Sequence, residues 1–162
     1  LSETRVGIGY DVHQLGDGAG LVLCGIQIPF NRSLIGHSDA DVALHALTDA
    51  LLGSVGMGDI GDHFPPTEEK WSGRSSSTFV EFAVDAMKQK NAKIINADLT
   101  LICEKPKISP FKEQMVRRVA DLLQVELSQV NVKATTTEGL GSMGRKEGIA
   151  ANAIVSIEIP TS

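Results

Sequence analysis

The sequence predicts a two-layer α+β fold in which helices pack against a mixed β-sheet. β-rich segments alternate along the chain with segments whose apolar residues recur at the helical period. The chain has 162 residues, of which 42% are hydrophobic, so we expect a single domain over residues 1–162 with one core. Only 4% are aromatic, so Val, Ile, Leu and Ala must fill that core.

The first part of the chain is expected to hold a strand, a hairpin and a helix. Residues 5–10 predict the strand, and residues 21–28 predict a hairpin-like stretch around Gly25, outside the main sheet. A helix is expected over 38–52, because Ser38 with Asp41 three residues later is close to a capping box. Its core face has helical spacing: Val42, Ala43, Ala46, Leu47, Ala50 and Leu51.

The second part predicts two helices and three strands around a long loop. Residues 56–74, rich in Gly, Pro and Asp, predict a loop, and loops of this length are usually functional or disordered. Ser109 as N-cap and Pro110 at the first helical position predict a helix that ends near Leu123. The other expected elements are a helix over 77–90 and strands over 97–103, 130–134 and 149–159.

A metal site is predicted where the first strand and the first helix meet. Asp11 and His13 are two residues apart, so on an extended strand they point to the same face. His45 lies on the predicted helix, on the face it shares with Asp41 and Asp49. Two imidazoles and a carboxylate are the ligand count of a catalytic zinc site whose fourth position stays open. On spacing alone the alternative stays open that His45 is a structural histidine and that the Asp-x-His spacing arises by chance. We expect Asp41 or Asp49 to orient the His45 ring.

Other segments offer groups that bind anions or cations. The run from Lys133 to Gly141 has hydroxyls and glycines that suit phosphate, and Glu138 suits a hard divalent cation, although spacing alone favours a plain threonine strand with a glycine turn. Lys105 and Lys107 precede a helix start and form either an anion site or a solvated loop. Arg145 could either bind an anion or form an ion pair with a carboxylate of a neighbouring chain.

Composition and motifs exclude several functions. The net charge of −5 and the lack of a basic stripe with interleaved aromatics argue against nucleic-acid binding, and no apolar run approaches the roughly 18 residues that a membrane span needs. Residues 7–12 lack the third glycine of a dinucleotide motif, and the chain has no nucleophile elbow. Cys24 and Cys103 stand in apolar runs and are expected to be buried free thiols.

These segments together resemble the 2-C-methyl-D-erythritol 2,4-cyclodiphosphate synthase family. The resemblance covers nearly the whole chain in order. It rests on Gly-Tyr-Asp-Val-His at 9–13, His-Ser-Asp-Ala-Asp-Val-Ala-Leu-His-Ala-Leu-Thr-Asp-Ala-Leu-Leu-Gly at 37–53, Gly-Asp-Ile-Gly at 58–61, Phe-Pro at 64–65, Pro-Lys at 106–107, Asn-Val-Lys-Ala-Thr-Thr-Thr-Glu at 131–138 and Gly-Arg-Lys-Glu-Gly-Ile-Ala at 144–150.

The resemblance implies a homotrimer of ferredoxin-like subunits, with helices on one face of each sheet and active sites between adjacent chains. The substrate would be 4-diphosphocytidyl-2-C-methyl-D-erythritol 2-phosphate. Its 2-phosphate attacks the β-phosphorus, CMP leaves and the 2,4-cyclodiphosphate of the non-mevalonate isoprenoid pathway forms. One Zn²⁺ per subunit on Asp11, His13 and His45 is implied, with Mg²⁺ or Mn²⁺ on Glu138 and the substrate diphosphate.

The resemblance also implies the other site residues. His37 and Thr136 would position the phosphates and stabilise the transition state, while Arg145 and Glu147 would face the trimer axis. The metal ligands Asp11 and His13 would also touch the substrate. The remaining substrate contacts would be Ser38, Asp59, Ile60, Gly61, Phe64, Pro65, Pro66, Thr67, Glu68, Cys103, Glu104, Lys105, Pro106, Lys107, Ile108, Ser109, Thr135, Thr137, Glu138, Ser142 and Arg145.

Two departures from the family pattern concern Pro66–Glu68 and Ser142–Met143, which leaves the contacts there open. Two other functions stay open: a zinc-dependent phosphoesterase, and a non-enzymatic trimeric binding protein with a structural zinc and His37 as fourth ligand. The resemblance implies the bacterial cytoplasm, or the plastid stroma after loss of a transit peptide. The chain begins without Met, so a transit peptide or a fused or associated cytidylyltransferase also stays open.

Overall fold

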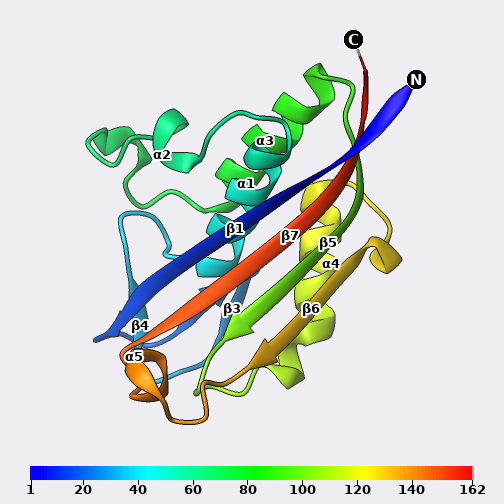
Figure 1. Ribbon diagram of the computed structural model, residues 1–162. Coiled ribbons are helices and arrows are strands. Elements are labelled where there is room, and N and C mark those ends of the chain that lie inside the picture. The colour runs from blue at the N-terminus through cyan, green and yellow to red at the C-terminus, as the bar shows by residue number, and fades with distance from the viewer. Residues whose placement is uncertain (162) are drawn as a thin grey trace.

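The computed structural model describes residues 1–161, in which a five-stranded mixed sheet carries helices on one face (Figure 1). The strand order is β4-β1-β7-β5-β6, and neighbours run antiparallel except for the parallel pair β5–β6. The strands are β1 (Ser2–Gly16), β4 (Ser33–Ile35), β5 (Lys93–Ile102), β6 (Val130–Thr135) and β7 (Gly148–Pro160).

Three helices form the second layer, behind the sheet in the view of Figure 1: α1 (Val42–Ser54), α3 (Ser77–Gln89) and α4 (Lys112–Leu123). The core lies between these helices and the sheet, and it is built from aliphatic side chains as the composition predicts. The hairpin of β2 (Leu21–Leu23) and β3 (Ile26–Ile28) forms its own two-stranded sheet. The predicted two-layer α+β arrangement and the separate hairpin are therefore confirmed.

The connectivity differs from the expected ferredoxin-like unit. In that unit two β-α-β halves alternate as β-α-β-β-α-β. Here two helices follow β1, and the chain continues through β5, α4 and β6 before β7 returns between β1 and β5. The parallel β5–β6 pair needs a crossover, which α4 provides. The ferredoxin-like topology that the resemblance implied was wrong, because the helices alternate with the strands in a different order and β7 inserts between β1 and β5.

Several element boundaries also differ from the prediction. The first strand extends from Ser2 to Gly16, so Asp11 and His13 lie inside it. Helix α1 begins at Val42, because the Asp41 side chain, and not that of Ser38, accepts a hydrogen bond from the Leu44 backbone N–H. Pro110 stands in a short 3-10 turn that precedes α4, and no cap bond from Ser109 is present there.

The loop predicted over 56–74 has structure of its own. It contains α2 (Ile60–His63) and a 3-10 turn, η1 (Glu69–Trp71). Further short elements are η2 (Ser109–Phe111), η3 (Leu127–Gln129) and α5 (Gly141–Gly144). None of the helices in residues 1–161 is both long and apolar enough to span a membrane.

The sheet face away from the helices carries an apolar row. Alternate side chains of β1 point there, and Ile154 of β7 pairs with Ile8. Val6, Ile8 and Tyr10 are 64%, 70% and 58% exposed, and Ile154 is 47% exposed. Contiguous exposed apolar side chains of this kind typically mark an interaction surface.

Candidate functional site

The predicted metal ligands lie together at the N-terminal part of α1. Asp11 and His13 project from β1 toward the helix layer, and His45 projects from the first turns of α1. His13 Nε2 lies 2.9 Å from Asp11 Oδ2, and His45 Nδ1 lies 3.1 Å from the same oxygen. The two ring nitrogens are 3.2 Å apart. Three possible ligand atoms therefore form a nearly equilateral triangle.

This triangle fits a tetrahedral zinc ion. Zinc bonds to nitrogen and oxygen of 2.0–2.1 Å place the ligands of a tetrahedron about 3.3 Å apart, close to the edges of 2.9, 3.1 and 3.2 Å measured here. The three side chains are only 14–27% exposed. In the part of the chain that the structure describes, this is the one cluster of three such groups whose ligand atoms lie within 4.8 Å of one another. The donor set and its spacing thus suit three protein ligands and one open position.

Hydrogen bonds at the far nitrogens set the tautomers of both rings. His13 Nδ1 lies 3.0 Å from the Ile35 carbonyl oxygen, which only accepts, so the neutral ring carries its proton on Nδ1 and has its lone pair on Nε2. His45 Nε2 lies 2.8 Å from Ser76 Oγ and 3.0 Å from Ser38 Oγ. The far nitrogens are thus bound to protein, while His13 Nε2 and His45 Nδ1 face Asp11.

The expectation that Asp41 or Asp49 orients His45 was wrong. Asp41 accepts backbone N–H bonds from Cys24, Gly25 and Leu44 at 3.0, 2.7 and 3.1 Å. Asp49 accepts one from Ile60 at 2.9 Å. Ser76 takes this role instead, and neither spacing nor composition pointed to it, because it is far from His45 in sequence. Ser38 joins it on the same ring nitrogen.

The charges in the cluster favour an ionised carboxylate. Burial raises the pKa of Asp11, but hydrogen bonds and charge interactions with His13 and His45 outweigh burial, and the pKa falls to about 2. A protonated His13 donates its Nε2–H to Asp11, and this hydrogen bond raises the pKa of His13. Asp11 is therefore a carboxylate at neutral pH, which is the form that binds a metal ion.

Two glycines explain why α1 lies close enough to β1 to form this cluster. Gly7 and Gly9 share the helix-facing side of β1 with Asp11 and His13. A Cβ atom at position 9 would lie 1.8 Å from the Ala46 carbonyl oxygen, and one at position 7 would lie 1.9 Å from that of Ala50. Only glycine permits this backbone contact, which brings the neighbouring His45 to Asp11.

The segment after α1 is anchored beside the cluster. Asp59 caps α2 through a capping box with Asp62, and Asp49 of α1 holds the Ile60 N–H. Phe64 is buried against Phe79 and Phe82, with ring centroids 4.7 and 5.0 Å away. Other predicted contacts in this segment are Gly61 in α2 and, after Phe64, Pro65, Pro66, Thr67 and Glu68.

A second pocket, of about 670 Å³, lies between the ends of β5 and β6 and the start of α4. Glu104 fixes the position of the neighbouring Thr137. The Glu104 Oε1 atom accepts the Thr137 N–H at 2.8 Å and the Thr137 hydroxyl at 3.2 Å. Burial raises the pKa of the Cys103 thiol to about 11, so this lining group is a neutral thiol at pH 7. The lining includes most of the predicted nucleotide contacts: Cys103, Glu104, Lys105, Pro106, Lys107, Ile108, Ser109, Thr135 and Thr136.

The remaining predicted residues are exposed around these two sites. The backbone N–H of Glu138 lies 3.1 Å from Thr136 Oγ1, and its own side chain is exposed. Arg145 pairs with Glu147 at 2.5 Å within its own chain. His37 is exposed, and Ser142 lies in α5. Within residues 1–161, Glu138 and His37 are not part of the Asp11–His13–His45 cluster.

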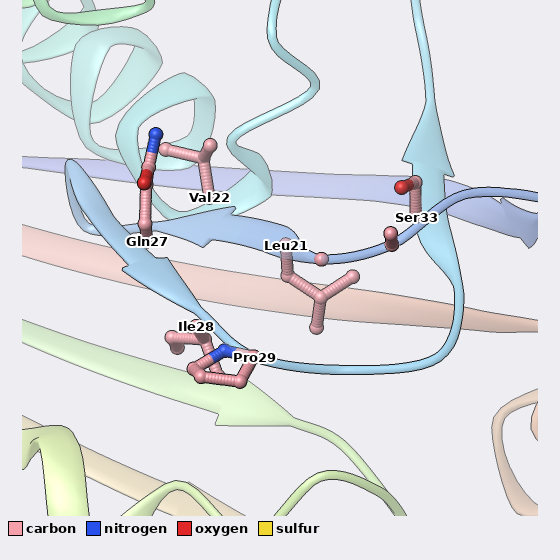
Figure 2. A pocket seen from close by; sticks show the side chains of 8 residues that line it. Leu21, Val22, Gln27, Ile28, Pro29 and Ser33 are labelled. Carbon is pink, nitrogen blue, oxygen red and sulfur yellow. The ribbon is translucent and has the colours of Figure 1, made fainter.

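A further pocket, of about 640 Å³, lies beside the β2–β3 hairpin (Figure 2). All eight lining residues are uncharged, and Leu21, Val22, Gln27, Ile28, Pro29 and Ser33 are labelled in the figure. It offers neither metal ligands nor acid–base groups.

Comparison with known proteins assigns the chain to a family. The model of the YgbB family matches residues 4–158. The chain belongs to the YgbB family. The chain is 54% identical to the bifunctional enzyme IspD/IspF of Chelativorans sp. strain BNC1, over 100% of this chain and 40% of the relative. The enzyme of that name from Caulobacter vibrioides is 53% identical over 97% of this chain and 41% of its own length. The chain thus spans about two fifths of the length of these curated relatives.

Solved structures agree with this family. The bifunctional IspDF of Campylobacter jejuni matches with a TM-score of 0.95 and 39% identity, over 99% of this chain and 43% of that one. A 2C-methyl-D-erythritol-2,4-cyclodiphosphate synthase matches with a TM-score of 0.86 and 38% identity, over 93% and 98% of the two chains. The IspF–CDP complex of Plasmodium falciparum matches with 0.85 and 33%, over 98% and 97%. The resemblance predicted from the sequence is confirmed.

Proposed function

We propose that this chain converts 4-diphosphocytidyl-2-C-methyl-D-erythritol 2-phosphate to 2-C-methyl-D-erythritol 2,4-cyclodiphosphate and CMP. An oxygen of the 2-phosphate attacks the β-phosphorus, and the bond from that phosphorus to the bridging oxygen of CMP breaks. The observation that carries the proposal is the Asp11–His13–His45 triangle in a member of the YgbB family. A relative of 38% identity is described as the synthase that makes this cyclic diphosphate.

The chemistry needs charge neutralisation more than a protein nucleophile. Both reacting groups are phosphates, so their repulsion is the first barrier, and positioning with electrostatic stabilisation lowers it. Asp11, His13 and His45 would hold Zn²⁺, and Glu138 would hold Mg²⁺ or Mn²⁺. Such ions supply Lewis-acid stabilisation of phosphate oxygens when bound. His37 and Thr136 would position the phosphates beside them.

The Cys103–Thr136 pocket is proposed to hold the cytidine. A relative of 33% identity is described as a CDP complex. The pocket is lined by a lysine-containing loop and by the threonine run, whose Thr137 is held by Glu104. Backbone N–H and C=O groups fixed in this way can orient a small ligand such as a nucleobase. The segment from Asp59 to Glu68 would then enclose the methylerythritol part.

The complete site is proposed to form between adjacent chains of a homotrimer. In residues 1–161 the metal cluster and the Cys103–Thr136 pocket share no residue, and they lie on different elements. The exposed row of Val6, Ile8, Tyr10 and Ile154 supplies an apolar surface for a second copy. Arg145 and Glu147 would lie near the trimer axis. A cytidylyltransferase that makes the cytidine diphosphate is the expected fused or associated partner.

Phosphorus NMR tests the reaction. Purified protein with the cytidine diphosphate substrate, Zn²⁺ and Mg²⁺ should give signals of a cyclic diphosphate and CMP in equal amounts. His45→Ala and a chelator should each abolish them, and Zn²⁺ should restore activity only to the chelated wild type. Inorganic phosphate or an open-chain product would favour the phosphoesterase instead. Absence of turnover, with zinc needed only for assembly, would favour the binding protein.

A further inference from the structure

The buried hydroxyl of Ser76 lies behind the metal cluster. Its Oγ is 2.8 Å from His45 Nε2, the ring nitrogen that faces away from Asp11. Ser75, Ser76 and Ser77 are consecutive, yet only Ser76 is buried, with 0% of its surface exposed. A fully buried hydroxyl needs hydrogen-bond partners, and this one has a histidine on one side.

Asp39 is the partner on the other side. Its Oδ1 accepts the Ser76 hydroxyl, and its Oδ2 accepts the Ser76 backbone N–H at 3.0 Å. The Asp41 N–H also binds Asp39 Oδ1, at 3.1 Å. Asp39 is therefore fixed by three donors, two of which are the backbone N–H and the hydroxyl of Ser76.

The proton positions follow from this arrangement. The carboxylate of Asp39 only accepts, so the single hydroxyl proton of Ser76 points to Asp39. Toward His45 the hydroxyl can then only accept, which requires the proton of the neutral ring to be on Nε2. Nδ1 keeps its lone pair, and this is the atom 3.1 Å from Asp11 Oδ2.

We propose that Asp39 and Ser76 are positioning residues that hold His45 in the tautomer and orientation needed to bind the metal ion. The inference rests on the proposed metal site and deepens it. An imidazole whose second nitrogen donates to a polar chain ending in a carboxylate is a stronger and better oriented ligand. Ser38, 3.0 Å from the same ring nitrogen, is the secondary partner because its hydroxyl has no carboxylate behind it among the contacts of residues 1–161.

The pair also ties the Gly56–Arg74 segment to the metal ligand. The Gly73 N–H binds the His37 carbonyl oxygen at 2.9 Å, and the Asp39 N–H binds that of Arg74 at 3.2 Å. The residues just before α1 and those just before α3 thus run side by side, and Asp39–Ser76 is the side-chain contact that extends this pairing to His45.

Zinc affinity measured by chelator competition tests the proposal without reference to turnover. Ser76→Ala and Asp39→Asn should each weaken zinc binding about 10- to 100-fold, the usual effect of losing an outer partner of a metal-binding histidine. Ser77→Ala is the matched control, a neighbouring serine of α3 that should bind zinc within about twofold of wild type. In zinc-loaded wild type, NMR should detect a slowly exchanging Nε2 proton on His45.

The outcomes separate the two proposals. If His45→Ala itself leaves zinc affinity unchanged, the metal site is wrong, and the positioning role with it. If His45→Ala weakens binding while Ser76→Ala and Asp39→Asn bind zinc as wild type does, only the positioning role is overturned, even if both variants are less stable. If neither variant folds, the wild-type spectrum decides: a His45 ring in zinc-loaded protein without a protected Nε2 proton overturns the inference.

Discussion

Replacing Gly9 by alanine should separate the metal ligands by pushing α1 off β1. A Cβ at position 9 would lie 1.8 Å from the Ala46 carbonyl oxygen, whereas real Cβ atoms essentially never come within 3.0 Å, so strand and helix must part by about 1.2 Å. The obstructing atom is backbone, so no side-chain rotation relieves the clash. His45 adjoins Ala46 in α1, and it therefore moves away from Asp11 with the helix.

The magnitude follows from the size of that shift. Overpacking of a core costs about 1–3 kcal/mol, and a clash between two backbones belongs at the upper end, about 3 kcal/mol. For a chain of this size that lowers the melting temperature by about 6–12 °C. The ligand atoms are now 2.9–3.2 Å apart, and a shift of α1 would move His45 Nδ1 out of the spacing that fits a tetrahedral zinc ion. We therefore expect zinc affinity to fall at least about tenfold.

Urea unfolding of zinc-free protein at one fixed protein concentration, with chelator competition on the folded protein, measures both effects. Gly53→Ala is the control: it adds the same methyl group within α1, with nothing within 4 Å, and should stabilise the protein by about 0.5–1 kcal/mol. A Gly9→Ala variant with wild-type stability and wild-type zinc affinity would refute the argument that backbone contact sets the site.

Three further predictions concern other parts of the molecule. Burial raises the pKa of Asp41 from 3.8 to about 6, so protonation of Asp41 stabilises the folded state. This stabilisation is fully present below the pKa of the unfolded chain and is lost as the pH rises through about 6. Asp41→Asn, which does not titrate, should therefore cost less stability at pH 7 than at pH 4, by about 2 kcal/mol in urea unfolding, and an equal cost at both would contradict this. Ile8→Asp should convert the proposed trimer to monomers in light scattering, while Leu127→Asp, outside the apolar row, should not; a trimeric Ile8→Asp protein would exclude this face as the interface between copies. Glu104→Gln should weaken CDP binding about 2- to 10-fold in calorimetry, because it weakens the hydrogen bonds that hold Thr137. Unchanged affinity would show that the Glu104–Thr137 contact does not support CDP binding.

Local sequence signals predicted most of the elements but not the way they pair. The amphipathic period of residues 77–90 and the β-rich runs near 130 and 149 were confirmed almost to the residue. The position of β7 between β1 and β5 depends on long-range pairing, for which the sequence has no local signal. The start of α1 was misplaced because Ser38 and Asp41 are both good capping residues. Only the tertiary fold shows that Asp41 is buried at the cap while Ser38 reaches His45.

The metal ligands were predictable because strand and helix periodicities bring them together, whereas their support was not. Asp11 and His13 follow the two-residue period of β1, so the sequence places them on one face of the strand. Only the contact between that face and His45 of α1 is not determined by local sequence. Ser76 belongs to a third element, and its burial depends on how the Gly56–Arg74 segment returns to α3. A serine among three serines has no property in sequence that distinguishes it.

One strand register sets both the packing and the chemistry of this fold. Gly7, Gly9, Asp11 and His13 occupy alternate positions on the same face of β1, so the pleat that presents two glycines to α1 also presents two ligands to His45. A slip of one residue would turn all four away and direct Val6, Ile8, Tyr10 and Val12 into the helix layer. Those side chains are too large for the backbone contact, so the packing that excludes the wrong register also protects the metal site.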